Sequence, residues 1–227
     1  MADTLLYYNL GEGVTAFSTE RGADLPFSVV QAHQVHGDKI AYANNSSLTR
    51  EDLEGIDALI TDVPGVAVGA RTADCIPVLL YDRVHRAVAA VHAGWRGTVL
   101  GISTKVLREM NSRFGTNPAD VRAVIGPGIG PDSFQVGEEV VEAFRKAGFP
   151  MESIHSFRGP LIPDTIQGGH HIDLWMANRW LLTESGLMET NIQTVGLCTY
   201  TLNDRFYSAR REGIRCPRII TAIRLYS

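Results

Sequence analysis

Two histidines and one cysteine, His36, Cys75 and His92, are the side chains in this sequence best suited to catalysis or metal binding. Two imidazoles and a thiolate form a ligand set that zinc accepts, and three protein ligands leave the fourth tetrahedral position for water. Such a water ionises near neutral pH and supplies hydroxide, or the metal polarises a substrate. The intervals between the three residues are long and match no short zinc motif, so the spacing also permits a buried structural cysteine and two structural histidines.

Cys75 and His92 also permit a different chemistry, that of a nucleophile and its base. An imidazolium beside a thiolate lowers the pKa of the thiol, and the thiolate attacks carbonyl groups. Either Asp74 or Asp57 would orient the histidine, and His36 would take no part. This alternative predicts a cysteine hydrolase, amidase or acyltransferase, and the spacing does not distinguish it from a metal centre.

The three residues lie where predicted strands end. His36 follows an apolar stretch, Cys75 separates two apolar β-branched strands, and His92 ends a third strand shortly before a helix. Such junctions on a rigid scaffold often carry function. Strands outnumber helices and several neighbours are predicted to be antiparallel, which favours an α+β fold over a regular βαβ array. We predict strands at 65–70, 76–81, 86–92, 121–125, 192–197 and 218–226, helices at 98–114, 137–147 and 173–184, and a surface loop at 150–170.

The length fits one large domain better than two small ones, and we predict a single globular domain over residues 1–227. Hydrophobic residues make up 44% of the chain and charged residues 20%, which excludes intrinsic disorder. The net charge of −4 and the pI near 6.0 give no basic surface for nucleic acid. The three cysteines are far apart and form no disulfide framework, no apolar run could span a membrane, and residues 1–10 do not resemble a signal peptide. We therefore expect a soluble, cytoplasmic protein without nucleic-acid or membrane partners.

Two further segments could shape a pocket or bind an anion. Segment 126–131 resembles a phosphate-binding loop only loosely, because its glycine spacing differs and its two prolines lack an N–H. A rigid turn in a pocket wall is the better interpretation. Four arginines around residues 206–208 could pair with phosphate or a carboxylate, or lie on a solvated strand edge. They are Arg205, Arg210, Arg211 and Arg215.

Six segments together resemble a known family. They occur in the order QVHG (34–37), ADCIPV (73–78), VHAGWRG (91–97), IGPGIG (125–130), CTY (198–200) and RFYSARREG (205–213). The set is similar to the multicopper polyphenol oxidase or laccase-domain family, whose members are also described as purine nucleoside phosphorylases or peptidoglycan editing factors. One stretch departs from the family pattern, because residues 17–28 are shortened and lack a second glycine.

The resemblance implies a fold, a metal and an activity. The fold is a single-domain mixed β-sandwich flanked by helices, similar to the catalytic domain of cytotoxic necrotizing factor. His36, Cys75 and His92 match the metal ligands, and the metal is usually zinc, with copper as the other candidate. The reactions are phosphorolysis of adenosine, inosine, guanosine and methylthioadenosine, and deamination of adenosine. The expected partners are therefore a purine nucleoside and phosphate.

We assign further roles within this resemblance. Asp74 would carry protons during catalysis beside the ligands His36, Cys75 and His92, and Gln34 would bind the sugar or the base. Arg96 and Arg211 would hold the anion, with Arg21 as a further pocket arginine whose register is altered in the shortened stretch. We expect a monomer or weak homodimer, since no heptad or apolar stripe indicates a stable dimer.

The laccase activity in the family's older name is not expected. A multicopper oxidase holds its copper centres largely with His-x-His pairs, and the seven histidines of this chain form none. One His-Cys-His set could imitate a blue-copper site, but no second cluster is available to reduce oxygen.

Overall fold

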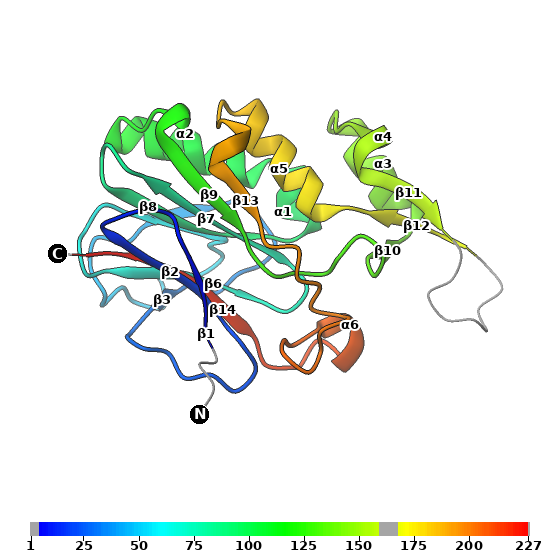
Figure 1. The fold of residues 1–227 in the computed structure, drawn as a ribbon, viewed down its shortest axis with the longest axis horizontal. Coiled ribbons are helices and arrows are strands. Elements are labelled where there is room, and N and C mark those ends of the chain that lie inside the picture. Colours follow the sequence, from blue (N-terminus) through cyan, green and yellow to red (C-terminus); the bar gives the residue numbers. More distant parts are fainter. Residues whose placement is uncertain (1–4, 159–167, 227) are drawn as a thin grey trace.

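The computed structural model describes residues 5–158 and 168–226 and has a mixed α+β fold. Two large β-sheets pack against each other, and helices cover the outer face of the larger sheet (Figure 1). A small third sheet extends from one side. The predicted α+β sandwich with flanking helices is confirmed, whereas the likeness to cytotoxic necrotizing factor stays a prediction.

The six-stranded sheet is apolar on both faces because both are covered. In β7 (Ile76–Asp82), Val78 and Leu80 pack with the helices, while Leu79 and Tyr81 face the second sheet. This strand and the next form a hairpin, which confirms the antiparallel pairing expected of neighbouring strands. The strands in spatial order are β13 (Ile192–Thr194), β9 (Val121–Ile125), β7, β8 (Ala87–Ala93), β5 (Ala58–Thr61) and β4 (Ile40–Tyr42).

The five-stranded sheet brings distant segments of the chain to one edge. Its strands in spatial order are β1 (Leu5–Tyr8), β2 (Val14–Thr19), β14 (Ile219–Leu225), β6 (Ala67–Thr72) and β3 (Val30–Gln31). β3 runs parallel to β6, whereas β14 is antiparallel to it, with Ile219 opposite Thr72. The ends of β3 and β6 and the start of β14 therefore lie at the same edge, next to the start of β7.

The helices pack on the six-stranded sheet through apolar side chains such as Val106 and Met110. The single helix predicted at 98–114 is wrong, because the chain forms two helices around Gly101. This glycine has φ +72°, a left-handed conformation that interrupts a right-handed helix. The helices are α1 (Trp95–Val99), α2 (Ile102–Phe114), α3 (Glu138–Lys146), α4 (Met151–Ile154), α5 (Leu174–Glu184) and α6 (Ala209–Glu212), with short 3-10 turns at Pro118–Asp120 and Glu189–Asn191.

The surface loop predicted at 150–170 is also wrong within the described residues. Pro150 precedes α4, and β11 (His155–Arg158) pairs antiparallel with β12 (Gly169–Ile172). β10 (Gln135–Val136) completes this small sheet. The cross-strand pairing is a long-range feature that the local proline content does not reveal. The loop prediction relied on three prolines, of which Pro160 and Pro163 lie outside the described residues.

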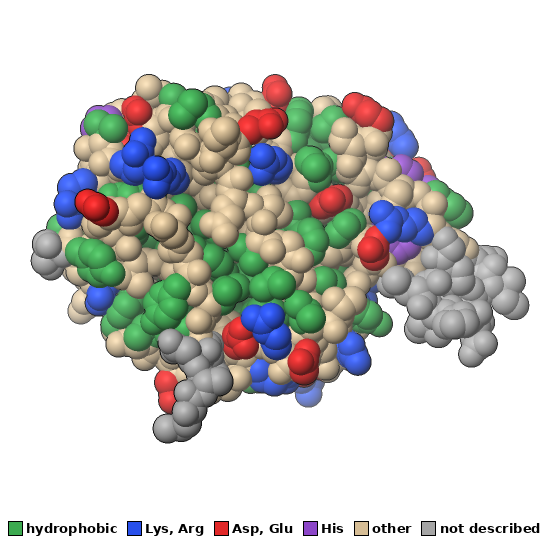
Figure 2. Space-filling view, viewed as in Figure 1, with side chains coloured by type: hydrophobic (Ala, Val, Ile, Leu, Met, Phe, Trp, Pro, Cys, Tyr) green, Lys and Arg blue, Asp and Glu red, His purple; other side chains and the backbone are tan. Residues whose placement is uncertain are grey.

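The surface carries charges of both signs. On the face shown in Figure 2, Lys and Arg side chains are interspersed with Asp and Glu around apolar areas. No helix within residues 5–158 and 168–226 has the length and apolar character required to cross a bilayer.

Candidate metal centre

His36, Cys75 and His92 meet at the shared sheet edge. His36 lies in the loop after β3, Cys75 directly precedes β7, and His92 lies near the end of β8. Because Pro77 is opposite His92 in the β7–β8 register, the cysteine is brought next to that histidine. The nitrogen and sulfur donors all lie within 4.8 Å of one another, and in the part of the chain that is described no other such group has three or more members.

The donor set fits a tetrahedral metal ion. Zinc bonded to two nitrogens and one sulfur would place the donors roughly 3.3–3.6 Å apart, so the donors would move closer by at most about 1.5 Å. Gly94 leaves the space for this approach, because a Cβ there would lie 3.0 Å from His36 Cδ2 and 3.1 Å from Cys75 Sγ. His36 is exposed, Cys75 is half-buried and His92 is buried, so the group opens to solvent on one side.

A buried carboxylate, Asp57, holds both histidines in place. Its Oδ1 accepts hydrogen bonds from the His36 N–H at 2.9 Å and from His92 Nδ1 at 2.8 Å. Its Oδ2 accepts the N–H groups of Val35 at 3.2 Å and Gly37 at 2.8 Å. Nδ1 of His92 is therefore protonated, and Nε2 is left to face a metal. The sequence left Asp57 and Asp74 as alternatives for orienting the histidine, and the geometry selects Asp57.

The backbone is strained at two positions of the site. His36 has φ +62° and Asp74 has φ +86°, in a region that residues with a side chain rarely adopt. The strain at His36 is held by the Asp57 carboxylate. At Asp74, the carboxylate accepts hydrogen bonds from the Thr199 hydroxyl and the Arg210 N–H, both at 2.6 Å. Strained residues that are fixed in this way are common in functional sites.

Cys75 and His92 stabilise each other's charged forms. Burial alone would raise the pKa of the thiol, but the charge of His92 and hydrogen bonds from both histidines outweigh it and lower the pKa of Cys75 to about 6. Burial would likewise lower the pKa of His92, but the cysteine and Asp57 outweigh it and raise that pKa to about 9. A thiolate is the form that binds metal, and a bound cation would take the place of the imidazolium charge.

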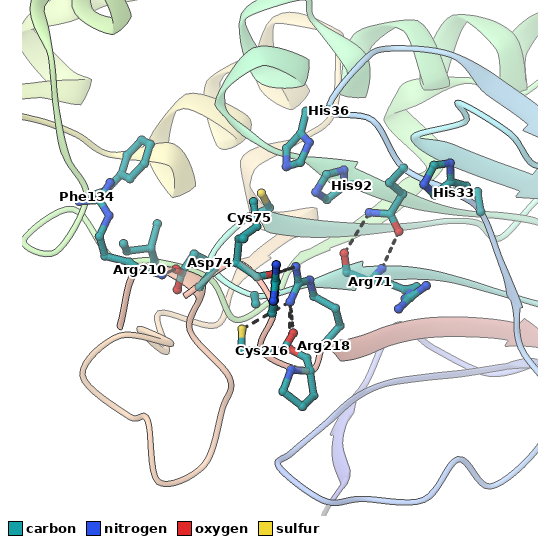
Figure 3. Close-up of a pocket in the computed structure, with 18 residues that line it drawn as sticks. His33, His36, Arg71, Asp74, Cys75, His92, Phe134, Arg210, Cys216 and Arg218 are labelled. Atoms are coloured by element: carbon teal, nitrogen blue, oxygen red, sulfur yellow. Dashed lines mark hydrogen bonds between the residues drawn. The ribbon is translucent and has the colours of Figure 1, made fainter. Parts of the chain in front are cut away.

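The three residues form part of the wall of a pocket of about 710 Å³, a size typical of small-molecule sites. Figure 3 shows His36, His92 and Cys75 together, with Phe134 and Arg210 on one side and Arg71 on another. The other lining residues are Ala32, His33, Gln34, Ala73, Asp74, Ile129, Ala209, Ile214, Arg215, Cys216, Pro217 and Arg218. The pocket thus combines apolar walls, a donor cluster and several arginines.

Two of the predicted substrate and proton-transfer residues line this pocket. Asp74 lies beside the cysteine, and Gln34 lies on the wall near Arg71. The Gln34 amide is bonded to the backbone of Arg71: Nε2 donates to the carbonyl oxygen at 2.9 Å, and Oε1 accepts the N–H at 2.8 Å. The Gln34 side chain therefore fixes the end of β6 as well as facing the pocket.

The three other predicted arginines lie outside the pocket lining. Arg96 stacks on the Trp95 ring, with 4.3 Å from its guanidinium carbon to the ring centroid. Arg211 donates to the Tyr200 carbonyl oxygen at 3.0 Å. Arg21 forms an ion pair with Glu212 at 2.9 Å, and this contact raises the pKa of the arginine. These contacts give the three arginines structural partners.

The sequence relates this chain to known proteins. A family described as multi-copper polyphenol oxidoreductase laccase matches residues 15–226. The chain belongs to this family. A purine nucleoside phosphorylase from Bacteroides thetaiotaomicron is 46% identical over 202 residues, which cover 87% of this chain and 72% of that protein. Adenosine deaminase RL5, from an unknown prokaryotic organism, is 43% identical over 171 residues, or 75% of this chain and 63% of that protein.

A solved structure shares the fold of the present chain. The crystal structure of the hypothetical protein YfiH from Bacillus licheniformis superposes with a TM-score of 0.87 at 28% sequence identity. The alignment covers 99% of this chain and 97% of that one. The expected family resemblance is thereby confirmed over nearly the whole described chain.

Several pocket residues were not singled out from the sequence. Arg71, Phe134 and Arg218 line the pocket, although nothing in their local pattern marks them as functional. Arg71 lies close before Cys75 along the chain, which is a signal that could have identified it. Arg218 was assigned to a strand, but β14 begins one residue later, at Ile219.

Proposed function

We propose that this chain is a zinc-dependent purine nucleoside phosphorylase with adenosine deaminase activity, acting on adenosine, inosine, guanosine and methylthioadenosine. The observation that carries the proposal is the cluster of His36, Cys75 and His92 in the wall of a pocket large enough for a nucleoside. Family membership supports it, because relatives are named for both reactions.

Some residues of the site would bind the metal, and others would orient the metal ligands or transfer a proton. His36, Cys75 and His92 would hold the zinc ion, which when bound supplies Lewis acidity and a water of lowered pKa. Asp57 would keep His92 in the tautomer that binds metal through Nε2. We also propose that Asp74 moves a proton, since each of its carboxylate oxygens accepts one hydrogen bond here and retains a second lone pair.

The apolar walls suit the purine. Phe134 and Ile129 line the pocket together with Ala73 and Ala209, and these side chains offer a slot for a flat base. Gln34 keeps one amide hydrogen and one oxygen lone pair beyond its contacts with Arg71, so it can still bind the sugar or the base.

A test of the proposal separates its two reactions. Zinc-loaded protein is incubated with adenosine and phosphate, and the products are resolved by chromatography. Adenine with ribose 1-phosphate reports phosphorolysis, whereas inosine reports deamination. We expect both products from the wild type and neither from His36→Ala. Full activity of His36→Ala would refute the metal-centred proposal.

One observation favours a second candidate, a cysteine hydrolase or amidase of the kind a peptidoglycan editing factor would need. Cys75, His92 and Asp57 form a thiol, imidazole and carboxylate in series, and the pKa of the thiol is lowered to about 6. Alkylation distinguishes the two candidates. A metal ligand reacts with iodoacetamide only after a chelator removes zinc, whereas a catalytic thiolate reacts rapidly with or without the chelator.

A further inference from the structure

The pocket has a strong positive charge in a chain whose net charge is negative. Four arginines line it, Arg71, Arg210, Arg215 and Arg218, against a single carboxylate, Asp74. The whole chain carries 21 basic and 25 acidic residues, so this sign is a local property of the pocket. None of the four arginines forms an ion pair with a carboxylate within residues 5–158 and 168–226.

Neutral groups hold Arg210 and Arg218, so the charges of these two arginines are not cancelled by a carboxylate. The Arg218 guanidinium donates to the main-chain carbonyl oxygens of Ile214, at 2.7 Å, and Cys216. Arg210 donates to the Gln135 carbonyl oxygen at 3.1 Å and lies over the Phe134 ring. Carbonyl dipoles and a ring face orient a guanidinium without cancelling its charge.

Arg71, near the end of β6, and Arg215, on the same loop as Arg218, complete the cluster. Gln34 binds the Arg71 backbone on both sides, so the residue is fixed at the end of β6 while its side chain is exposed. Arg215 is exposed on the loop that leads into β14, and its side chain makes no hydrogen bond to the described residues. Because β6 and β14 are paired, these segments meet at the edge that carries Cys75.

The labelled arginines of the cluster lie on the sides of the pocket away from His36. Figure 3 places Arg218 and Cys216 on the opposite side of Cys75 from His36, with Arg71 and Arg210 to either side. A nucleoside bound between the donor cluster and the arginines would thus have an anion site beside it. The planar guanidinium fork matches the oxygens of phosphate and can bind two of them at once.

We propose that Arg71, Arg210, Arg215 and Arg218 form an oxyanion subsite that binds the inorganic phosphate consumed in phosphorolysis. This inference rests on the proposed function and deepens it, because it assigns the co-substrate to residues other than Arg96 and Arg211. In the reaction, an oxygen of hydrogenphosphate forms a bond to the anomeric carbon as the bond from that carbon to the purine nitrogen breaks. The bonding electrons leave with the purine nitrogen, which takes the proton of hydrogenphosphate, so the products are ribose 1-phosphate and the free base.

The same subsite chemistry would also suit a phosphate ester on the nucleoside. The two sources of phosphate differ in what they predict. A site for inorganic phosphate gives saturation by phosphate with inosine as the second substrate. A site for an ester makes AMP bind more tightly than adenosine, with no saturable binding of inorganic phosphate.

The experiment uses Arg71→Gln and Arg215→Gln, with Arg83→Gln as the matched control. Arg83 is an exposed arginine beyond the far end of β7, roughly 25 Å along the strand from Cys75. The KM for phosphate is measured in inosine phosphorolysis, the Kd for phosphate by calorimetry, and kcat/KM for adenosine deamination without phosphate. Deamination would use the same pocket without phosphate, so a loss of deamination in a variant would indicate that the pocket as a whole is disturbed.

We expect each pocket variant to raise the KM and Kd for phosphate about tenfold or more, as loss of a charge-assisted hydrogen bond does. Deamination should fall far less than phosphorolysis in both variants, because it does not use the phosphate subsite, and Arg83→Gln should match the wild type throughout. Unchanged phosphate binding in both variants, equal losses of both reactions, or AMP binding without phosphate binding would each overturn the proposal. If the wild type catalysed neither reaction, the proposed function would fail, while the phosphate Kd values would still decide whether the subsite exists.

Discussion

Replacing Asp57 with asparagine should weaken metal binding without touching a metal ligand. Asp57 has no exposed side-chain surface, and its two oxygens accept four hydrogen bonds, three from the loop around His36 and one from His92. Asparagine keeps one oxygen and turns the other into an NH₂ group. That NH₂ group must face donors, so two of the four bonds are lost.

The cost follows from these contacts. A hydrogen bond to a charged acceptor contributes about 1.5–3 kcal/mol, so two lost bonds cost roughly 3–6 kcal/mol of folding free energy. The loss of orientation at His92 should lower metal affinity about 10- to 100-fold, the usual effect of removing the carboxylate behind a ligating histidine. The pKa of Asp57 is lowered, because hydrogen bonds from His92 and Gly37 outweigh the effect of burial. Its stabilisation is therefore present above about pH 4 and is lost as the pH falls through the lowered value.

The assay is competition for zinc between the protein and a chromophoric chelator, with urea unfolding measured in parallel. Asp82 provides a matched control at the far end of β7. The Asp82 side chain is also buried, and its carboxylate accepts hydrogen bonds from the backbone N–H groups of Val84 and His85 and from Nδ1 of His85. Asp82→Asn should lower stability in the same way and leave zinc affinity unchanged.

Two outcomes would contradict the role assigned to Asp57. A folded Asp57→Asn protein with wild-type zinc affinity would show that the carboxylate does not position His92 for metal. Equal losses of zinc affinity in Asp57→Asn and Asp82→Asn would show that the effect reflects general destabilisation.

Three other predictions concern single positions. Gly94→Ala should weaken zinc binding while the protein stays folded, because the added Cβ would lie 3.0 Å from a carbon of His36. Chelator competition measures the zinc affinity, and an unchanged affinity would contradict the close approach of Gly94 to His36. In metal-free protein, the rate of Cys75 alkylation should reach half its maximum near pH 6, since the pKa of the thiol is lowered to about 6; a midpoint above pH 8 would refute the thiolate assignment. Gly101→Ala should lower the free energy of unfolding in urea by about 1–2 kcal/mol, because residue 101 has φ +72°. Zinc affinity should not change, and an unchanged free energy of unfolding would contradict this backbone conformation.

The sequence predicted the part of the site that depends on local patterns. Strands 76–81 and 86–92, with the turn between them, form a hairpin, and its pairing brings Cys75 and His92 together. His36 was grouped with them on residue type, and the family resemblance strengthened this choice. No local pattern brings His36 to the other two, because β3 has only two residues and joins β6 through a distant parallel pairing.

The rest of the site depends on contacts that no local pattern contains. Asp57 reaches both histidines from the residue before β5, and sequence alone left it equal to Asp74. Arg218 was expected within a strand, yet its guanidinium is held by loop carbonyls that exist only after the loop has folded. The helix break at Gly101 was missed because the apolar periodicity continues through it, and periodicity does not report φ.

The proposed metal centre is tested most directly by titrating zinc into chelator-stripped protein and following inosine phosphorolysis. If His36, Cys75 and His92 form the catalytic metal site, activity will rise with zinc and reach its plateau at one equivalent per chain. The Cys75→Ala variant will bind no zinc at this site and show no activity at any zinc concentration. Full phosphorolysis by the metal-free protein, or by Cys75→Ala, would show that these three residues do not form a catalytic metal site.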